Sequence, residues 1–180
     1  MRLVEGIAHV DDVDAFVASL AEIGADHGVT VQAFDARYVV SSAHLVRAVE
    51  LADRAFARDE NVAHDRAVEI LLYAAGRRQI DRALEMGVDA GEQPVVVLID
   101  GGATGDGSDG DDVDVDQIGV GEAGATAAVE ALLDPAETLG TYDVDRVRDY
   151  FDVGERELRA VDGELADLVL ERVALLDVGK

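Results

Sequence analysis

The sequence is defined first by residue types that it lacks. It contains no cysteine, which excludes disulfide bonds and thiolate chemistry. It contains no tryptophan, four tyrosines and four phenylalanines, which argues against a nucleic-acid surface built on base stacking. No uncharged apolar run is long enough for a transmembrane helix, and Glu5 interrupts the start of the chain before a signal-peptide core could form. We therefore expect a soluble, cytoplasmic protein that does not contact a membrane.

Positive charge is also scarce. The chain has 15 lysine and arginine residues against 39 aspartate and glutamate residues, a formal net charge of -24 and a pI of about 4.2. Such self-repulsion is hard to sustain in dilute buffer, but at roughly 1 M salt the Debye length shrinks to about 3 Å. Because the carboxylates are spread over the whole chain rather than gathered in a tail, we interpret the acidity as adaptation to the salt-rich cytoplasm of a haloarchaeon.

The length of 180 residues suits one domain spanning 1–180. Apolar residues follow the period of strands in some segments and the period of helices in others. The expected strands are 3–8, 29–34, 38–40 and 95–99, with 113–120 as an edge strand at best, and the expected helices are 13–23, 45–56, 65–75, 77–86, 122–133, 144–151 and 155–176. The run 95–99 is continuously apolar, which is typical of a strand buried on both faces. We predict an α+β fold in which helices flank both faces of a small mixed sheet and a long helix ends the chain.

An acidic, low-complexity segment, 101–112, reads GGATGDGSDGDD and is predicted to be a mobile loop inserted in the domain. Residues 105–110 match the G-x-G-x-x-G pattern of dinucleotide-binding folds. However, Asp111, Asp112 and Asp114 follow, which would repel a pyrophosphate, and no helix opens there. The spacing of these aspartates also lacks the order and the final glutamate of an EF-hand. We interpret the segment as a passive insertion.

No pattern in the sequence identifies a catalytic centre. The four histidines lie far apart and lack the spacing of metal ligands, so no metal site is predicted. There is no G-x-S-x-G motif for a serine nucleophile. Aspartate and glutamate are so abundant that pairs of carboxylates arise by chance, and none is assigned as an acid–base dyad. We therefore predict that the protein is not an enzyme, with no catalytic residue and no cofactor.

One short segment of the sequence, around Arg77 and Arg78, is basic. The amphipathic run 65–75 predicts a helix that meets Gly76, the usual residue for a left-handed, helix-ending turn. A second predicted helix, 77–86, starts at once, so its first turn is expected to present free backbone N–H groups beside Arg77 and Arg78. Together with the helix dipole, these groups would form an anion-binding corner. The alternative is that the two arginines are exposed and pair with nearby carboxylates.

The predicted C-terminal helix, 155–176, is apolar on more than one side. A helix with one apolar stripe packs against its own core, whereas a broader apolar surface buries a second contact as well. The main stripe contains Leu158, Val161, Leu165, Leu168, Val169, Val173 and Leu176, and the further apolar positions are Leu170, Ala174 and Leu175. Two interpretations stay open: a central core helix, or a docking face for another protein.

Three segments resemble the PRPK-binding protein family, the small regulatory subunit of the KEOPS complex. They are SAHLVRAVELA (42–52), AVEILLYAAGRRQIDRALEMG (67–87) and LERVALLDV (170–178). The family pattern is a histidine at a helix start, then E-I-L…A-S-G-x-R-Q-I, a strand and a final apolar helix, and the chain follows this order over most of its length. The sequence departs from the pattern at Ala75, where serine is typical, and in the acidic insertion.

The resemblance implies a non-catalytic subunit of the complex that installs threonylcarbamoyl on the adenosine beside the anticodon of tRNA. Such a subunit binds the N-lobe of an atypical kinase/ATPase subunit through its C-terminal helix and meets the other KEOPS subunits indirectly. In archaea it also captures the single-stranded 3′ CCA end of tRNA. The motif match assigns tRNA binding to Gly76, Arg77, Arg78, Gln79, Ile80, Ser42 and His44. The kinase-binding candidates are Leu168, Val169, Val173, Leu175 and Leu176.

Two other functions are considered. A small-molecule enzyme or nucleotide-binding domain would use the helix N-terminus at Gly76 and Arg77 as a phosphate site, but it also needs an acid, base or nucleophile beside that corner. An acidic scaffold without a ligand would make no use of Arg77 or Arg78 in binding. With a net charge of -24, any tRNA contact is expected to be small and local, and its affinity should therefore depend only weakly on salt.

Overall fold

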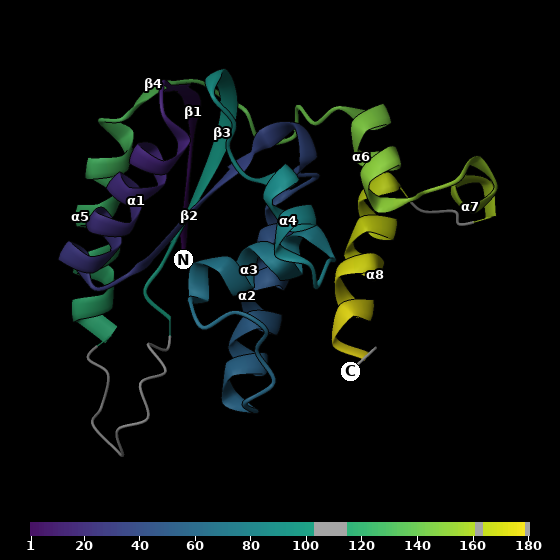
Figure 1. The fold of residues 1–180 in the computed structure, drawn as a ribbon, viewed down its shortest axis with the longest axis horizontal. Helices are drawn as coiled ribbons and strands as arrows, with labels where there is room; N and C mark the ends of the chain where they lie inside the picture. Colours follow the sequence, from purple (N-terminus) through teal and green to yellow (C-terminus); the bar gives the residue numbers. More distant parts are fainter. Residues whose placement is uncertain (103–114, 161–163, 179–180) are drawn as a thin grey trace.

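The structure is a computed structural model that describes residues 1–102, 115–160 and 164–178. Most of the predicted acidic loop lies outside the described residues, and so does Val161 of the predicted C-terminal stripe. Figure 1 shows a central sheet with helices on both sides and a further helical layer beyond one of them. The predicted α+β class, with helices on both faces of the sheet, is confirmed.

A four-stranded sheet with the order β2-β3-β1-β4 lies at the centre of the fold. Every pair of neighbouring strands in it is antiparallel, which corrects the prediction of a mixed sheet. The strands are β1 Arg2–Val10, β2 Thr30–Asp35, β3 Gly91–Asp100 and β4 Leu133–Pro135.

Helices α1 and α5 lie on one face of the sheet, and α2 and α3 lie on the other (Figure 1). Helices α6 and α8 form an outer layer beyond α2 and α3, and α7 projects from it. The helices are α1 Val13–His27, α2 Ser42–Ala57, α3 Arg66–Ala75, α4 Ile80–Ala83, α5 Val115–Glu130, α6 Val144–Phe151, α7 Glu155–Ala160 and α8 Leu165–Val178, with short 3-10 helices η1 Ala36–Tyr38 and η2 Leu84–Met86.

Two helical crossovers explain why the sheet is antiparallel. Helix α1 connects β1 with β2, and α5 connects β3 with β4. One other strand lies between the two members of each pair: β3 separates β1 from β2, and β1 separates β3 from β4. Strands that run in the same direction are therefore not adjacent in the described sheet, although the alternation of strands and helices in the sequence is compatible with parallel pairs.

Strand β3 is buried on both faces, as its continuous apolar sequence predicts. Residues 95–99 have no exposed surface, and the strand pairs with the whole length of β1. Val95 and Val97 belong to the core on the side of α1 and α5, whereas Val96 and Leu98 belong to the core on the side of α2, α3 and α8. Because successive side chains of β3 point to opposite faces of the sheet, the strand requires an apolar layer of helices on each face.

Several predicted elements differ from the structure. The expected strand 38–40 is not formed, because its first residue ends the 3-10 helix η1. Residues 115–120 are helical instead of extended, because α5 begins upstream of the predicted helix. The expected helix 155–176 is divided into α7 and α8. The sequence does not predict β4, because three residues are too few to show the alternation of apolar and polar side chains typical of a strand, and the last of them is a proline.

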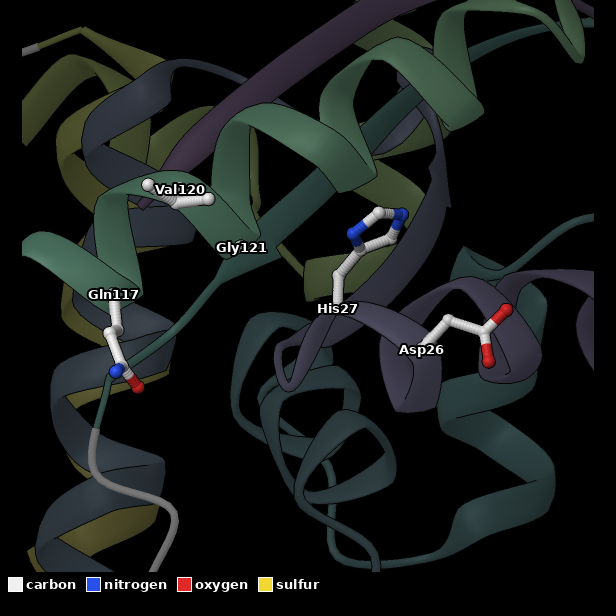
Figure 2. Close-up of a pocket in the computed structure, with 5 residues that line it drawn as sticks. All are labelled: Asp26, His27, Gln117, Val120 and Gly121. Carbon is white, nitrogen blue, oxygen red and sulfur yellow. The ribbon is translucent and has the colours of Figure 1, made fainter.

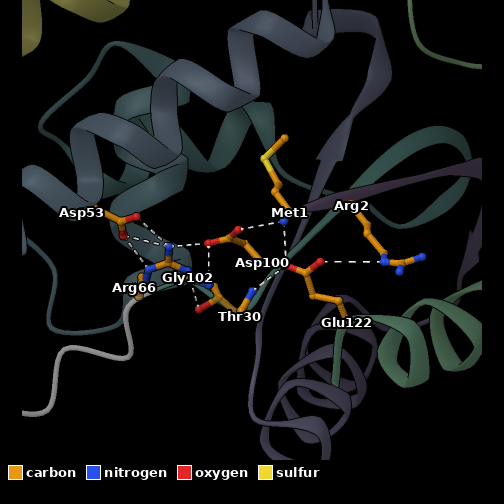
Figure 3. Close-up of polar contacts among 9 residues, drawn as sticks. Met1, Arg2, Thr30, Asp53, Arg66, Asp100, Gly102 and Glu122 are labelled. Atoms are coloured by element: carbon orange, nitrogen blue, oxygen red, sulfur yellow. Dashed lines mark hydrogen bonds and ion pairs between the residues drawn. The ribbon is translucent and has the colours of Figure 1, made fainter. Parts of the chain in front are cut away.

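A cluster of ion pairs joins the ends of several elements (Figure 3). Arg66, at the start of α3, lies 2.8 Å from Asp53 of α2 and 2.6 Å from Asp100 of β3. The N-terminal ammonium of Met1 lies 3.3 Å from Asp100 and 2.6 Å from Glu122 of α5. Burial alone would raise the pKa of Asp100, but the two cations outweigh it and hold that pKa below its ordinary value. The cluster therefore fastens both helical layers to the sheet.

The contact between α1 and α5 depends on glycines of α5 (Figure 2). A Cβ atom at Gly121 would lie 2.4 Å from the backbone oxygen of His27, and one at Gly124 would lie 2.6 Å from the His27 ring. A Cβ atom at Gly119, by contrast, would have no neighbour within 4 Å. Helix α5 therefore needs glycine where it approaches the end of α1, and not on its exposed side.

We expect alanine to have opposite effects at two glycines of α5. Gly121→Ala should lower the free energy of unfolding by about 1–3 kcal/mol, because its methyl group collides with the backbone of His27. Gly119→Ala, the matched control, should raise it by about 0.5–1 kcal/mol, because alanine forms helices more readily than glycine. Urea unfolding in high salt measures both values. Stabilisation by both substitutions would show that α5 does not approach α1 this closely.

Candidate functional site

The turn at Gly76 ends α3 as predicted. Gly76 has φ 60° and ψ 31°, the left-handed conformation that glycine adopts without strain. The N–H of Gly76 donates to the carbonyl of Tyr73 at 3.0 Å, and the N–H of Arg77 donates to the carbonyl of Leu72 at 3.0 Å. These two bonds satisfy carbonyls at the end of α3 and fix the direction in which the chain leaves it.

The predicted second helix does not start at Arg77. Helix α4 begins at Ile80, after Gln79 in an extended conformation, and has only four residues. The N–H of Arg77 is already bonded within the turn at Gly76. The expectation of free helix N–H groups beside Arg77 and Arg78 is therefore wrong, because the helix-ending turn uses the first of them and the next helix starts later.

The side chain of Arg77 lies within the fold. It is half-buried, and its Nη2 donates a hydrogen bond to the backbone oxygen of Tyr150 in α6. Its guanidinium carbon is 5.4 Å from the centroid of the Tyr150 ring, a cation–π contact. Its Nε is buried and has no hydrogen-bond partner in the described structure. Arg77 therefore joins the end of α3 to α6 and is not a free guanidinium at the surface.

Arg78, Gln79 and Ile80 are three consecutive exposed residues of the predicted tRNA site, and we call these three residues the α4 edge. Nη2 of Arg78 donates to the backbone oxygen of Leu176 in α8 at 3.2 Å, while the side chain as a whole stays exposed. Ile80 exposes 42% of its surface. The α4 edge thus offers a cation, an amide and an apolar group to solvent within three consecutive residues.

Gly76 and Ser42 are two further residues of the predicted tRNA site, and of these two Ser42 is the exposed one. A Cβ atom at Gly76 would meet the backbone oxygen of Arg172 in α8 at 3.6 Å, so the open side of the glycine faces the protein. Gly76 is needed for its left-handed conformation and does not open the surface to a ligand backbone. Ser42 is exposed in the first turn of α2, and Ser41 provides the N-cap of that helix.

His44 is fully buried between α2 and the end of α3. Its Nε2 donates to the carbonyl of Ala74 at 2.8 Å, and its ring lies edge to face with Phe151, with 5.8 Å between the centroids. Burial lowers the pKa of His44 to about 4, although the hydrogen bond to Ala74 acts in the opposite direction. The imidazole is therefore neutral at pH 7 and out of reach of a ligand, which corrects its assignment to the tRNA-binding surface.

Helix α8 contributes to both the core and the surface. Leu168, Val169 and Val173 are buried in the core, because α8 packs on α2, α3 and α6. They are not available to a partner at the surface, which corrects their assignment to a kinase-binding face. Leu176 is half-buried against the same core, whereas Leu175 exposes 56% of its surface. The core interpretation of this helix therefore holds for Leu168, Val169 and Val173, and the docking interpretation stays a prediction for exposed positions such as Leu175.

The further apolar positions of α8 that the sequence indicates border its exposed side, and the sequence does not indicate Val46 of α2 beside them. Leu170 and Leu175 are five residues apart, roughly 140° around the helix, so they lie on its two flanks. The half-buried Ala174 and the exposed Glu171 lie between them. Leu170, Ala174 and Leu175 are the apolar part of this side. We call these three residues the α8 surface. Val46 of α2 exposes 38% of its surface and lines, with Leu170, a shallow hollow of about 550 Å³ that also includes Ser42.

The α4 edge and the α8 surface are neighbours in the structure. The hydrogen bond from Arg78 to the backbone oxygen of Leu176 places the last turns of α8 beside the α4 edge, and Leu175 is the adjacent residue. The local pattern of the sequence contains no signal for this contact, since the two residues are separated by 98 positions. The structure therefore brings together parts of two sites that the sequence treats separately.

Another concave surface does not gather reactive side chains. A hollow between the end of α1 and α5 is lined by Asp26, His27, Gln117, Val120 and Gly121 (Figure 2), and the side chains of Asp26 and Gln117 point away from each other. Within the described residues, no three or more His, Cys, Asp or Glu side chains are placed to hold a metal ion. In the same part of the chain, no helix combines the length and the apolar character needed to cross a membrane.

Comparison of the sequence with known families gives the class of protein, one described as kinase-binding. The family model of Kinase binding protein CGI-121 matches residues 9–177. The chain belongs to this family. The match covers α2, the turn at Gly76, the α4 edge and the α8 surface, and it confirms the kinase-binding part of the resemblance. No curated protein matches the sequence.

His44 should make the stability of the protein depend on pH. Its pKa in the folded state is about 4, against an ordinary value of 6.5, so the unfolded chain binds more protons between these values. Its contribution is complete above pH 6.5 and should fall by roughly 2–3 kcal/mol as the pH approaches 4.

The measurement is urea unfolding between pH 7.5 and pH 4 for wild type, His44→Gln and the control His64→Gln, whose native side chain is exposed. We expect His44→Gln to show a shallower loss of stability with acid than the other two proteins. Identical slopes in all three would show that His44 gains a proton as readily in the folded state as in the unfolded one.

Proposed function

We propose that this protein is a non-catalytic regulatory subunit of the KEOPS complex, which installs threonylcarbamoyladenosine in tRNA, in the cytoplasm of a haloarchaeon. In this role it binds and stimulates the atypical kinase/ATPase subunit directly, meets the remaining subunits indirectly and recruits tRNA through its 3′ CCA end. Membership of a kinase-binding family supports the first of these contacts. The observation that carries the proposal is the exposed apolar α8 surface on an otherwise strongly charged chain.

The α8 surface suits a protein partner. Leu175 exposes 56% of its surface and Val46 exposes 38%, in a chain of which 30% of the residues are charged. Neither residue belongs to the buried core, to which α8 contributes Leu168 and Val173. Apolar side chains grouped on an exposed helix and surrounded by charges are typical of a docking site. The kinase contact is therefore assigned to Leu175, Leu170 and the neighbouring Val46.

The α4 edge suits a small contact with the single-stranded end of tRNA. The guanidinium of Arg78 can donate to a phosphate or to a base edge, and the amide of Gln79 can both donate and accept. Ile80 adds an exposed apolar surface beside them. Because Arg78 is the one cation of the α4 edge, such a contact neutralises few phosphates. This agrees with the expectation that the affinity for tRNA depends only weakly on salt.

The alternative of an enzyme or nucleotide-binding domain has less support. Its phosphate site requires free N–H groups at Arg77, but that N–H is bonded to Leu72 and the Arg77 guanidinium is bonded to Tyr150. An enzyme would also need an acid or a base beside this corner, but the histidine there, His44, is buried and neutral at pH 7. Both observations favour a surface that recognises partners.

The kinase contact is tested by Leu175→Glu. We expect this substitution to weaken capture of the atypical kinase/ATPase subunit at least about tenfold, because a carboxylate would be buried against an apolar partner surface. The fold should be unaffected, since Leu175 is largely exposed. The readout is co-purification of the kinase in about 1 M KCl, where long-range charge effects are screened.

The matched control is Val120→Glu, which places the same charge on the exposed surface of α5, across the sheet from α8. It should leave kinase capture unchanged. Unchanged capture by Leu175→Glu would place the kinase contact elsewhere on the protein.

The tRNA contact is tested by Arg78→Glu. Binding of intact tRNA should weaken about tenfold or more in Arg78→Glu, because one donor to the CCA end is replaced by a like charge. Arg159→Glu is the control, since the Arg159 side chain is 79% exposed on α7 and pairs only locally, with Glu155. Gel-shift or anisotropy measurements in about 1 M KCl compare intact tRNA with tRNA that lacks its CCA end.

Two results would contradict the tRNA proposal. One is equal affinity for intact and truncated tRNA, and the other is equal affinity of wild type and Arg78→Glu. Either result would leave the kinase contact in place, because the two tests use different residues and different partners.

A further inference from the structure

A chemically labile pair of residues lies where strand β3 ends. Asp100 is the last residue of β3, where it pairs with Thr30 of β2, and Gly101 follows it directly. In unfolded peptides, an aspartate followed by glycine readily forms a cyclic succinimide, because glycine has no Cβ atom to hinder ring closure. The ring then opens to isoaspartate, in which the main chain runs through the former side chain.

The surroundings of this pair favour both of its residues. The carboxylate of Asp100 lies 2.6 Å from Arg66 and 3.3 Å from the ammonium of Met1, so it joins other elements to the sheet. A Cβ atom at Gly101 would lie 2.5 Å from Cγ2 of Ile118 in α5, so a larger residue would crowd this helix. Aspartate and glycine are therefore each suited to their place, although together they form a labile pair.

Ring closure has three requirements. The backbone nitrogen of Gly101 must be free to attack Cγ of Asp100, where a new N–C bond forms. The carboxyl group must be protonated, because its hydroxyl leaves together with the N–H proton as water. The Cα–C bond of Asp100 must also rotate to bring the two atoms together. Water then opens the ring, and its addition at the main-chain carbonyl carbon of Asp100 gives isoaspartate.

Glu122 of α5 holds the attacking nitrogen. The N–H of Gly101 donates to Oε1 of Glu122 at 3.0 Å, and both residues are buried. The nitrogen therefore turns toward Cγ of Asp100 only if a hydrogen bond to a carboxylate breaks. Such a bond is stronger than one between neutral groups, and at a buried position no water replaces the lost partner.

The side chain of Asp100 is also held in an unreactive state (Figure 3). Its Oδ2 accepts from Nη2 of Arg66 at 2.6 Å and from the N–H of Gly102 at 3.1 Å. These donors favour the ionised carboxylate, which has no hydroxyl to lose. The pairing of Asp100 with Thr30 also restricts rotation about its Cα–C bond. Each of the three requirements is therefore opposed by a contact of the folded protein.

We infer that Asp100-Gly101 is a latent site of isoaspartate formation, which Glu122 and Arg66 keep closed while α5 is packed on the sheet. The reaction then requires a locally opened state in which Glu122 has left Gly101. Isoaspartate adds one carbon to the main chain and takes one from the side chain, so the contact with Arg66 does not re-form as before. A transient opening of α5 thus becomes a permanent defect. The site shares no residue with the α8 surface or the α4 edge, so it does not depend on the function proposed above.

The test follows isoaspartate formation at residue 100 over time. The full-length protein is incubated in about 1 M KCl, either folded or unfolded in urea. After chymotryptic digestion, mass spectrometry with electron-transfer fragmentation assigns isoaspartate to individual residues. Folded wild type should react at residue 100 at least about tenfold more slowly than the urea-unfolded chain. The pairs Asp106-Gly107 and Asp109-Gly110 of the same chain are the internal reference when variants are compared.

Three variants separate the hydrogen bond of Glu122 from stability in general. Glu122→Ala removes the acceptor and should raise the rate at residue 100 at least about tenfold over folded wild type. Glu122→Gln keeps an acceptor oxygen and should raise it less. Val147→Ala, in the buried core of α6, lowers stability without touching the pair and should leave the rate unchanged. Circular dichroism and urea unfolding check that each variant is folded during incubation.

Hydrogen exchange tests the same contact in wild type, without a variant. Exchange and ring closure both need the N–H of Gly101 to leave Glu122, so this amide should be protected in the folded protein. An amide that exchanges as fast as in the unfolded chain would overturn the inference.

Three results of the incubation would also overturn it. The first is an equal rate at residue 100 in folded and urea-unfolded wild type. The second is an equal rate in Glu122→Ala and Val147→Ala, which would assign the protection to burial alone. The third is a slower rate in Glu122→Ala than in wild type, which would make Glu122 a base that promotes the reaction.

Discussion

Burial of β3 on both faces is the constraint on which the rest of the fold depends. Five consecutive apolar residues, 95–99, are removed from water only if helices cover both sides of the sheet. Helices α1 and α5 occupy one side, and α2 and α3 occupy the other. No sheet surface is then left for α8, which packs on α2 and α3 instead. Because α8 lies in the outermost layer, one of its sides faces solvent, and Leu175 is exposed at the margin of that side.

Several arginines of this acidic chain join elements of the fold to one another. Arg66 fastens α3 to α2 and β3, Arg77 fastens the end of α3 to α6, and Arg172 connects α8 with Glu157 of α7 at 2.7 Å. A guanidinium presents several N–H donors in a fixed geometry, which suits a cross-link between elements. Arg78 differs because its side chain stays exposed beside α8. Part of the scarce positive charge of this protein therefore holds the fold together and is not available at the surface for recognition.

The sequence predicts those features that neighbouring residues decide. The turn at Gly76 and the doubly buried strand 95–99 both follow from short-range order, and both are confirmed. The interior position of Arg77 does not, because its partner Tyr150 is 73 residues away. Leu168 and Leu175 belong to one helix and have the same side chain, and only the packing of α8 decides that the first is buried and the second exposed. For about half of the residues predicted to bind tRNA or the kinase, only the tertiary structure therefore shows whether the side chain is buried or exposed.

Helix α5 has a property that follows from its close approach to α1. The glycines Gly119, Gly121 and Gly124 each cost about 1 kcal/mol of helix stability relative to alanine. Gly121 is nevertheless required, because a Cβ atom there would lie 2.4 Å from the backbone oxygen of His27. An isolated helix of this length is marginal even with good helix formers, so α5 owes its hydrogen bonds to its neighbours. Because α5 depends on its contacts with α1 and the sheet, we expect this helix to open locally at a lower free energy than the paired strands β1 and β3.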